Sequence, residues 1–110
     1  MSETLTQYGT NFQSKILTSL LTDVKYTKQI LDIIEINYFD SDSNKFIIKS
    51  IKDYFKKYKT NPTMEALKVM VDEVDNDVLK TSIVDSLRNA WQHRESNDLE
   101  FVKEKSLEFC

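Results

Sequence analysis

Apolar residues recur along this chain at the spacing of three and four residues that places them on one face of an α-helix. The first such stretch covers residues 12–21 and carries Ile16 and Leu20. Asp23 follows it and can cap a second helix, whose apolar positions are Val24, Ile30, Leu31 and Ile34. The pattern therefore predicts two short consecutive helices.

A third helix is expected from about Ser43 to Tyr58, because the short polar side chains of residues 40–43 can cap its first turn. Asn61-Pro62-Thr63 is the clearest break, since proline disfavours the α conformation of the residue before it. Thr63 can then cap a fourth helix that runs to about Val74. The expected apolar face of the third helix consists of Ile47, Ile51, Tyr54 and Tyr58.

A fifth and a sixth helix complete the pattern. Asp75-Asn76 opens the fifth and Ser96-Asn97 the sixth, where Glu100 lies three residues after Asn97 in the arrangement of a capping box. The apolar stripe of the fifth comprises Leu79, Ile83, Leu87, Ala90 and Trp91, and that of the sixth Leu99, Val102 and Phe109.

The scarcity of glycine supports an all-α fold. Average usage of about 7% predicts roughly eight glycines, whereas the chain has only Gly9. Tight turns between strands need residues that tolerate positive φ. We expect one domain over residues 1–110, a compact bundle of about six short helices. Its predicted core comprises Leu17, Leu20, Ile30, Phe39, Ile47, Ile51, Tyr54, Leu67, Ile83 and Leu87.

Composition and charge indicate a cytoplasmic protein. The chain has 40% apolar residues and a formal net charge of -3, and it contains no apolar run long enough to span a bilayer. Its first residues lack the basic and apolar regions of a secretory signal. Cys110 is the only cysteine, which fits a reducing compartment.

The sequence offers no catalytic, metal or cofactor site. Residues 40–44 match the opening of a calcium loop, but Lys45 replaces its glycine and Ile51 its bidentate glutamate. His93 and Cys110 are the only soft metal ligands, too few for a zinc site. One glycine cannot form a phosphate-binding loop, so ATP hydrolysis by this chain is excluded.

The third helix carries a stripe of basic residues. Residues 45–59 have a charge of +5 and leave -8 for the rest of the chain. Such a stripe is typical of a solvated helix face, and it could also meet phosphates or an acidic partner. Its members are Lys45, Lys49, Lys52 and Lys56.

The order of these elements resembles the N-terminal domain of DnaB-like replicative DNA helicases, especially those of large tailed phages. The resemblance covers about residues 12–110. It runs through the pair Tyr38-Phe39 before the third helix, through the break at residues 61–63, and to the start of the closing helix at residues 98–102. The individual motifs are apolar spacings, which are not very specific. The resemblance therefore rests on the order of the motifs and on the distances between them along the chain.

The resemblance implies a collar domain with no catalytic role. In such helicases six N-terminal domains stack above a motor ring, pair through a closing helical hairpin, and dock primase or helicase loader. ATP and Mg²⁺ would be bound by the parent protein, and DNA would be contacted through it. The location would be the host cytoplasm if a phage encodes the chain. The sixth helix still reads as helix at residue 110, so we expect the chain to be part of a longer protein.

Two other interpretations remain open, a stand-alone helical adaptor for a host protein and a weak nucleic-acid-binding domain that uses the lysine stripe. The sixth helix is the candidate interface, because its apolar stripe of Leu99, Val102 and Phe109 needs to be covered. We expect residues 97–110 to pack either against another chain or onto their own core, and we do not expect a full ring from this chain alone.

Overall fold

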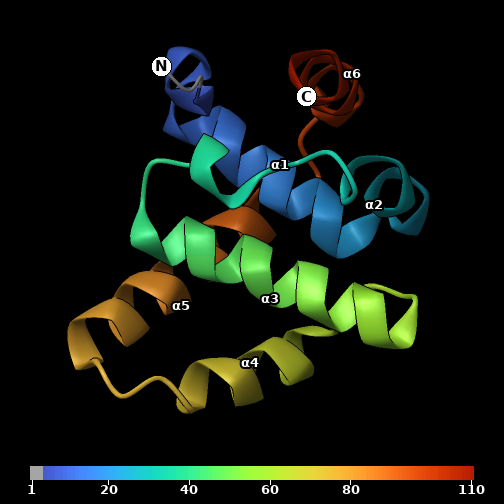
Figure 1. Cartoon of the computed structure of the whole chain (residues 1–110). Coiled ribbons are helices and arrows are strands. Elements are labelled where there is room, and N and C mark those ends of the chain that lie inside the picture. The colour runs from blue at the N-terminus through green and yellow to red at the C-terminus, as the bar shows by residue number, and fades with distance from the viewer. Residues whose placement is uncertain (1–3) are drawn as a thin grey trace.

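The computed structural model describes residues 4–110, and within that range the chain is all-α, as predicted. Six α-helices and two short 3-10 helices follow one another without a strand in the described range (Figure 1). Their bounds are η1 Leu5–Tyr8, α1 Thr10–Thr22, α2 Val24–Ile30, η2 Ile36–Tyr38, α3 Asp42–Tyr58, α4 Met64–Asp72, α5 Asp77–Gln92 and α6 Leu99–Phe109.

Helix α1 lies at the centre and contacts α2, α3, α5 and α6. Its residues Ile16, Leu17 and Leu20 are fully buried, because their spacing places them on neighbouring parts of the helix surface. Thr18, on another face, is also buried and donates a hydrogen bond to the carbonyl of Ala90 in α5. The helix is therefore covered on more than one side, and the other elements are arranged around it.

Side-chain caps begin four of the helices as the sequence predicts. The side chains of Asp23, Ser41, Thr63 and Asn76 each accept a hydrogen bond from the backbone N–H three residues later. Each such cap satisfies a backbone donor that has no partner within the helix, and is worth about 1 kcal/mol. These caps explain where α2, α3, α4 and α5 begin.

The capping box predicted for the sixth helix is wrong. Asp98, not Asn97, occupies the cap position of α6, and its side chain makes no capping hydrogen bond. The Asp98 carboxylate instead lies 2.8 Å from Lys15 Nζ in α1, and Glu100 pairs with Lys103. Asp98 at the cap position thus forms a long-range ion pair, and Glu100, which the pattern assigned to the capping box, forms a local one.

The predicted core is confirmed at nine of its ten positions, all of which are buried. Tyr54 is the exception and is only half-buried. Leu5 of η1, a segment that the apolar periodicity did not cover, is buried as well. Ile34, an apolar position of the predicted second helix, is also buried, although α2 ends before it at Ile30.

The two ends of the bundle are covered differently. Helix α6 lies against α1 and α2, whereas the main neighbour of α4 among the described elements is α5. In Figure 1, α6 is at the top of the molecule and α4 is at the bottom, with α1 and α3 between them. Within the described range, the helices fall short of the length and apolarity that a membrane span requires.

Candidate functional site

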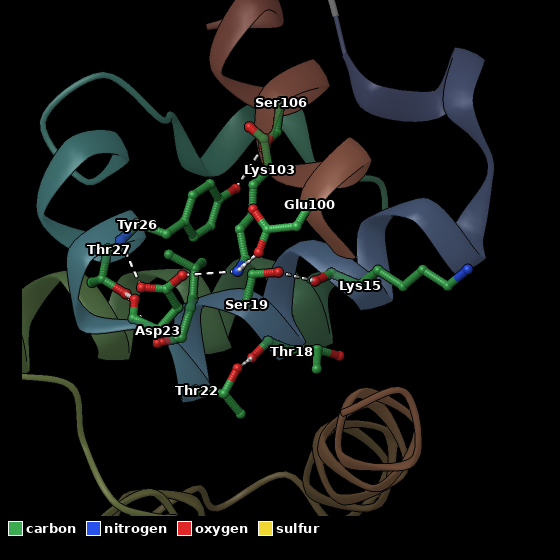
Figure 2. A network of polar contacts seen from close by, with 11 residues as sticks. Lys15, Thr18, Ser19, Thr22, Asp23, Tyr26, Thr27, Glu100, Lys103 and Ser106 are labelled. Atoms are coloured by element: carbon green, nitrogen blue, oxygen red, sulfur yellow. Dashed lines mark hydrogen bonds and ion pairs between the residues drawn. The ribbon is translucent and has the colours of Figure 1, made fainter. Parts of the chain in front are cut away.

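A network of polar contacts joins α6 to α1 and α2 (Figure 2). We call this network the α6 seat; its residues are Asp23, Tyr26, Glu100, Lys103 and Ser106. Lys103 Nζ lies 2.8 Å from Asp23 Oδ2 and 3.0 Å from Glu100 Oε1. The other carboxylate oxygen of Asp23 accepts the cap hydrogen bond from the Tyr26 amide at 3.0 Å. The Lys103 hydrogen bond, helped by this cap, holds the pKa of Asp23 below its usual value. One carboxylate thus begins α2 and fastens α6.

A second polar contact in the same seat is buried. The Tyr26 hydroxyl lies 2.6 Å from Ser106 Oγ, and Ser106 Oγ donates to the Lys103 carbonyl at 3.0 Å. Ser106 has one hydroxyl hydrogen, so Tyr26 is the donor to it. Burial raises the pKa of Tyr26 far above its usual value although the Ser106 hydrogen bond lowers it. Tyr26 therefore stays a neutral donor and ties α2 to α6.

The predicted interface stripe packs onto its own domain, which is one of the two expected outcomes. Val102 is buried, and Leu99 and Phe109 are half-buried. The Phe109 ring lies edge-on to those of Tyr8 and Tyr38, with ring centroids 5.9 and 5.0 Å apart. The stripe covers the α1 side of the core, so these three residues do not form an open apolar surface here.

The lysine stripe is only partly available for an outside anion. Lys49 pairs with Asp53 at 2.9 Å, and Lys52 Nζ donates to the carbonyl of Ile34 at 2.6 Å. Lys45 is half-buried and Lys56 is exposed. Two of the four ammonium groups therefore have partners within the chain, and Lys52 supports the loop that leads from α2 to η2.

Tyr54 and Tyr58 do not lie in the core, contrary to the prediction from the sequence. The buried face of α3 is made by Ile47, Ile48 and Ile51, and it is rotated away from both tyrosines. Tyr58 is 54% exposed, and its ring contacts that of Tyr54 at a tilt of 45°, with centroids 4.5 Å apart. The helical spacing allowed either rotation, and packing against α5 and η2 decides between them.

A groove between α4 and α5 was not predicted. It has a volume of about 370 Å³ and a mainly apolar surface, although four of the eight side chains that line it are charged. A second hollow continues it toward Trp91, which was predicted to lie on the buried stripe of α5 but is 40% exposed. The groove is lined by Met64, Glu65, Lys68, Val71, Asp72, Val84, Leu87 and Arg88.

The signal that could have revealed this groove is apolar residues on the polar faces of α4 and α5. Val69, Val78 and Val84 fall outside the buried stripes of their helices and are 60%, 79% and 40% exposed. Together with Trp91, they make up half of the eight large apolar residues that are exposed in the described range. Half of the exposed large apolar residues therefore lie on α4 and α5, and two of them, Val84 and Trp91, line the two hollows.

Groups that could bind a metal are not gathered anywhere in the described residues, where no cluster of three or more histidine, cysteine or acidic side chains occurs. His93 follows the last turn of α5. Cys110 is half-buried, and burial raises the pKa of its thiol to about 11.

Comparison of this chain with protein-family models, with curated proteins and with solved structures gives no match.

Proposed function

We propose that this chain is the non-catalytic N-terminal domain of a DnaB-like replicative DNA helicase, active in collar assembly and in the docking of primase or helicase loader. The observation that carries the proposal is the order of the helices and their caps. The buried Phe39 after η2, the break before Thr63 and the start of α6 at Leu99 fall at the points on which the resemblance rests.

The use of polar groups in the fold supports a docking role. The most deeply engaged polar side chains, such as Thr18, Tyr26 and Ser106, bind other parts of the chain. Asp23 and Asp98 are held by lysines of other helices. These groups orient helices, whereas half of the exposed large apolar residues lie on α4 and α5. A surface of that kind suits protein contact more than chemistry.

The reading frame of the gene beyond codon 110 tests this proposal. A helicase requires that the frame continue into a motor domain with a phosphate-binding loop, since ATP and Mg²⁺ would be bound there. A stop codon, or a continuation into an unrelated domain, would contradict the helicase assignment. A stop codon would instead support the stand-alone adaptor. In either case the chain would act in the cytoplasm.

The isolated chain is expected neither to hydrolyse ATP nor to bind single-stranded DNA tightly at physiological salt. Its lysine stripe has two of its four ammonium groups paired within the fold. Phosphate release assays and fluorescence anisotropy with a labelled oligonucleotide measure the two activities. Tight binding that is lost in Lys49→Glu would favour the nucleic-acid-binding alternative, because that lysine is exposed and belongs to the stripe.

A further inference from the structure

We infer that α4 is a hinged lid, which swings away from α3 and α5 about the connection at residues 59–63 while the rest of the bundle stays folded. The motion exposes Leu67 and Val71, which are buried in the closed position, together with the part of α5 against which α4 packs. This lid goes beyond the proposed function, because it concerns a motion within the chain and requires no particular partner.

The connection begins at a residue in an unfavourable backbone conformation. Lys59 ends α3 with a φ of 62° and a ψ of 24°, in the left-handed region. It is the one residue other than glycine with a positive φ among residues 4–110. A residue with a Cβ meets a steric cost there that glycine avoids. The closed position of α4 depends on this turn, because an ordinary conformation of Lys59 would direct the chain elsewhere.

The side-chain amide of Asn61, two residues later, is buried without a hydrogen-bond partner. Its Oδ1 and Nδ2 atoms are both inaccessible, and neither has a partner among the described residues. The next residue, Pro62, is buried as well and lines the hollow beside Trp91. An amide that is removed from water and gains no partner destabilises the state in which it is buried. Opening of the connection returns the amide to water, so it opposes a second local cost of the closed position.

Packing around α4 is incomplete on several sides. The groove toward α5 has a volume of about 370 Å³, and the hollow beside Trp91, at the N-terminal end of α4, one of about 480 Å³. A further hollow of about 430 Å³ lies between α3 and α4, where Phe46 and Met70 are among the lining residues. Each hollow removes neighbours that α4 would otherwise contact, so fewer dispersion contacts break when the helix leaves.

The two ends of α4 allow it to move as an intact helix. Its cap is its own, since Thr63 Oγ1 accepts a hydrogen bond from the Ala66 amide at 3.0 Å. Beyond its C-terminal end, residues 74–76 lie outside any helix and lead to α5. The hydrogen bond from Lys80 Nζ to the Asp72 carbonyl is 3.4 Å long and adds little resistance. Residues 59–63 and 74–76 can therefore turn while α4 keeps its structure.

Native-state hydrogen exchange at a series of low urea concentrations tests the inference. The exchange rates give the opening equilibrium of each amide, and their urea dependence reports how much surface the opening exposes. We expect the amides of α4 to open together, with a urea dependence about half that of α1 amides or less. The amides of α1 lie at the centre of the bundle and exchange through global unfolding.

Three substitutions of Lys59 locate the hinge. Lys59→Gly suits the left-handed turn and should slow exchange in α4 about threefold, because it favours the closed position alone. Lys59→Gln removes the charge but keeps the Cβ, so exchange should stay within about 1.5-fold of the original chain. Lys59→Val is β-branched and should speed exchange about fivefold or more. Exchange in α1 should shift by the same factors, because global unfolding releases the turn too.

A substitution at Asn61 checks the second local cost. Asn61→Leu replaces the buried amide with an apolar side chain of similar shape and should slow exchange in α4 about threefold or more. Asn97→Leu makes the same change at an exposed asparagine outside the connection, and it should leave α4 exchange unchanged.

Several results would overturn the inference. Equal urea dependence in α4 and α1 would show that α4 opens only with the whole chain. Slower exchange in α1 but not in α4 of Lys59→Gly would show that the turn persists when α4 opens, which places the hinge elsewhere. No effect of Lys59→Gly, an equal effect of Lys59→Gln, or faster α4 exchange in Asn61→Leu would each show that the connection does not oppose the closed position.

Discussion

The α6 end and the α4 end of this molecule are joined to the rest of the bundle by different kinds of contact. Helix α6 is fixed to α1 and α2 by two long-range ion pairs, at Lys15 and Lys103, and by the buried Tyr26–Ser106 hydrogen bond. Helix α4 is joined mainly by burial of Leu67 and Val71. A side-chain hydrogen bond also joins α5 to α4, from Lys80 Nζ to the Asp72 carbonyl. At 3.4 Å it is long for a hydrogen bond.

The difference shows that polar contacts can fix one helix of a small bundle while another is held mainly by apolar burial. Polar contacts are directional, so those of Lys103 and Tyr26 fix the position of α6 and leave its apolar stripe covered. Apolar packing is not directional, and at α4 it covers one stripe of the helix while Val69 and Met64 remain accessible to different degrees. The groove lies beside α4, which is the helix held without such polar contacts.

The largest expected effect is a core truncation, and it should differ between the two regions. Leu20→Ala in α1 should lower the free energy of unfolding by about 3–5 kcal/mol, because the residue is enclosed and its surroundings cannot collapse. Leu67→Ala in α4 should cost about 2–3 kcal/mol, because α4 has fewer neighbours to hold the cavity open. Urea denaturation measures both. Equal costs would remove the energetic distinction between the two ends.

The carboxylate of Asp23 allows its two roles at the α6 seat to be separated. Asp23→Ala loses both the cap of α2 and the pair with Lys103, and should cost about 2 kcal/mol. Asp23→Asn keeps a capping oxygen and loses only the ion pair, and should cost less than about 1 kcal/mol. Thermal or urea unfolding distinguishes them. If Asp23→Asn proved as damaging as Asp23→Ala, the ion pair and not the cap would dominate.

Acid should loosen the α6 seat. The pKa of Asp23 is lowered in the folded chain, chiefly by the Lys103 hydrogen bond. The stability it contributes is therefore present above the ordinary aspartate pKa, near 4, and is lost as pH falls through the lower folded value. The free energy of unfolding should decrease between about pH 5 and pH 2, and less steeply in Asp23→Asn. Parallel pH profiles for the two proteins would contradict this.

The smallest effects are expected at exposed valines of α5. Val84→Glu and Val78→Glu should each change the free energy of unfolding by about 0.5 kcal/mol or less, because the residues are 40% and 79% exposed. Circular dichroism melting curves of both variants provide the check. A large loss in Val84→Glu alone would mean that the groove wall is part of the core and not an open surface.

Local sequence patterns predicted where most of the helices begin, but they did not predict the ion pairs that hold α6 in place. The caps at Asp23, Thr63 and Asn76 are signalled within four residues of sequence, and the structure confirms them. The ion pairs of Lys15 with Asp98 and of Lys103 with Asp23 join residues that are far apart in sequence. No local pattern marks such partners, because they depend on how whole helices are placed.

The same reason explains the errors on α3 and α5. Helical periodicity showed that each helix has an apolar side, but the extent and rotation of the buried face depend on the neighbouring helices. Tyr58 and Trp91 lie at the edges of those faces and are exposed. The groove beside Trp91 is formed by two helices together, so neither helix pattern predicted it alone.

Amide hydrogen exchange of the free chain tests most directly the central claim, that the α6 side is fastened and the α4 side is held loosely. We predict that amides in the middle of α6 exchange about as slowly as those of α1, and that amides of α4 exchange at least about tenfold faster. The Lys103 and Tyr26 contacts must break for α6 to open. Exchange in α6 as fast as in α4, or faster, would contradict the claim.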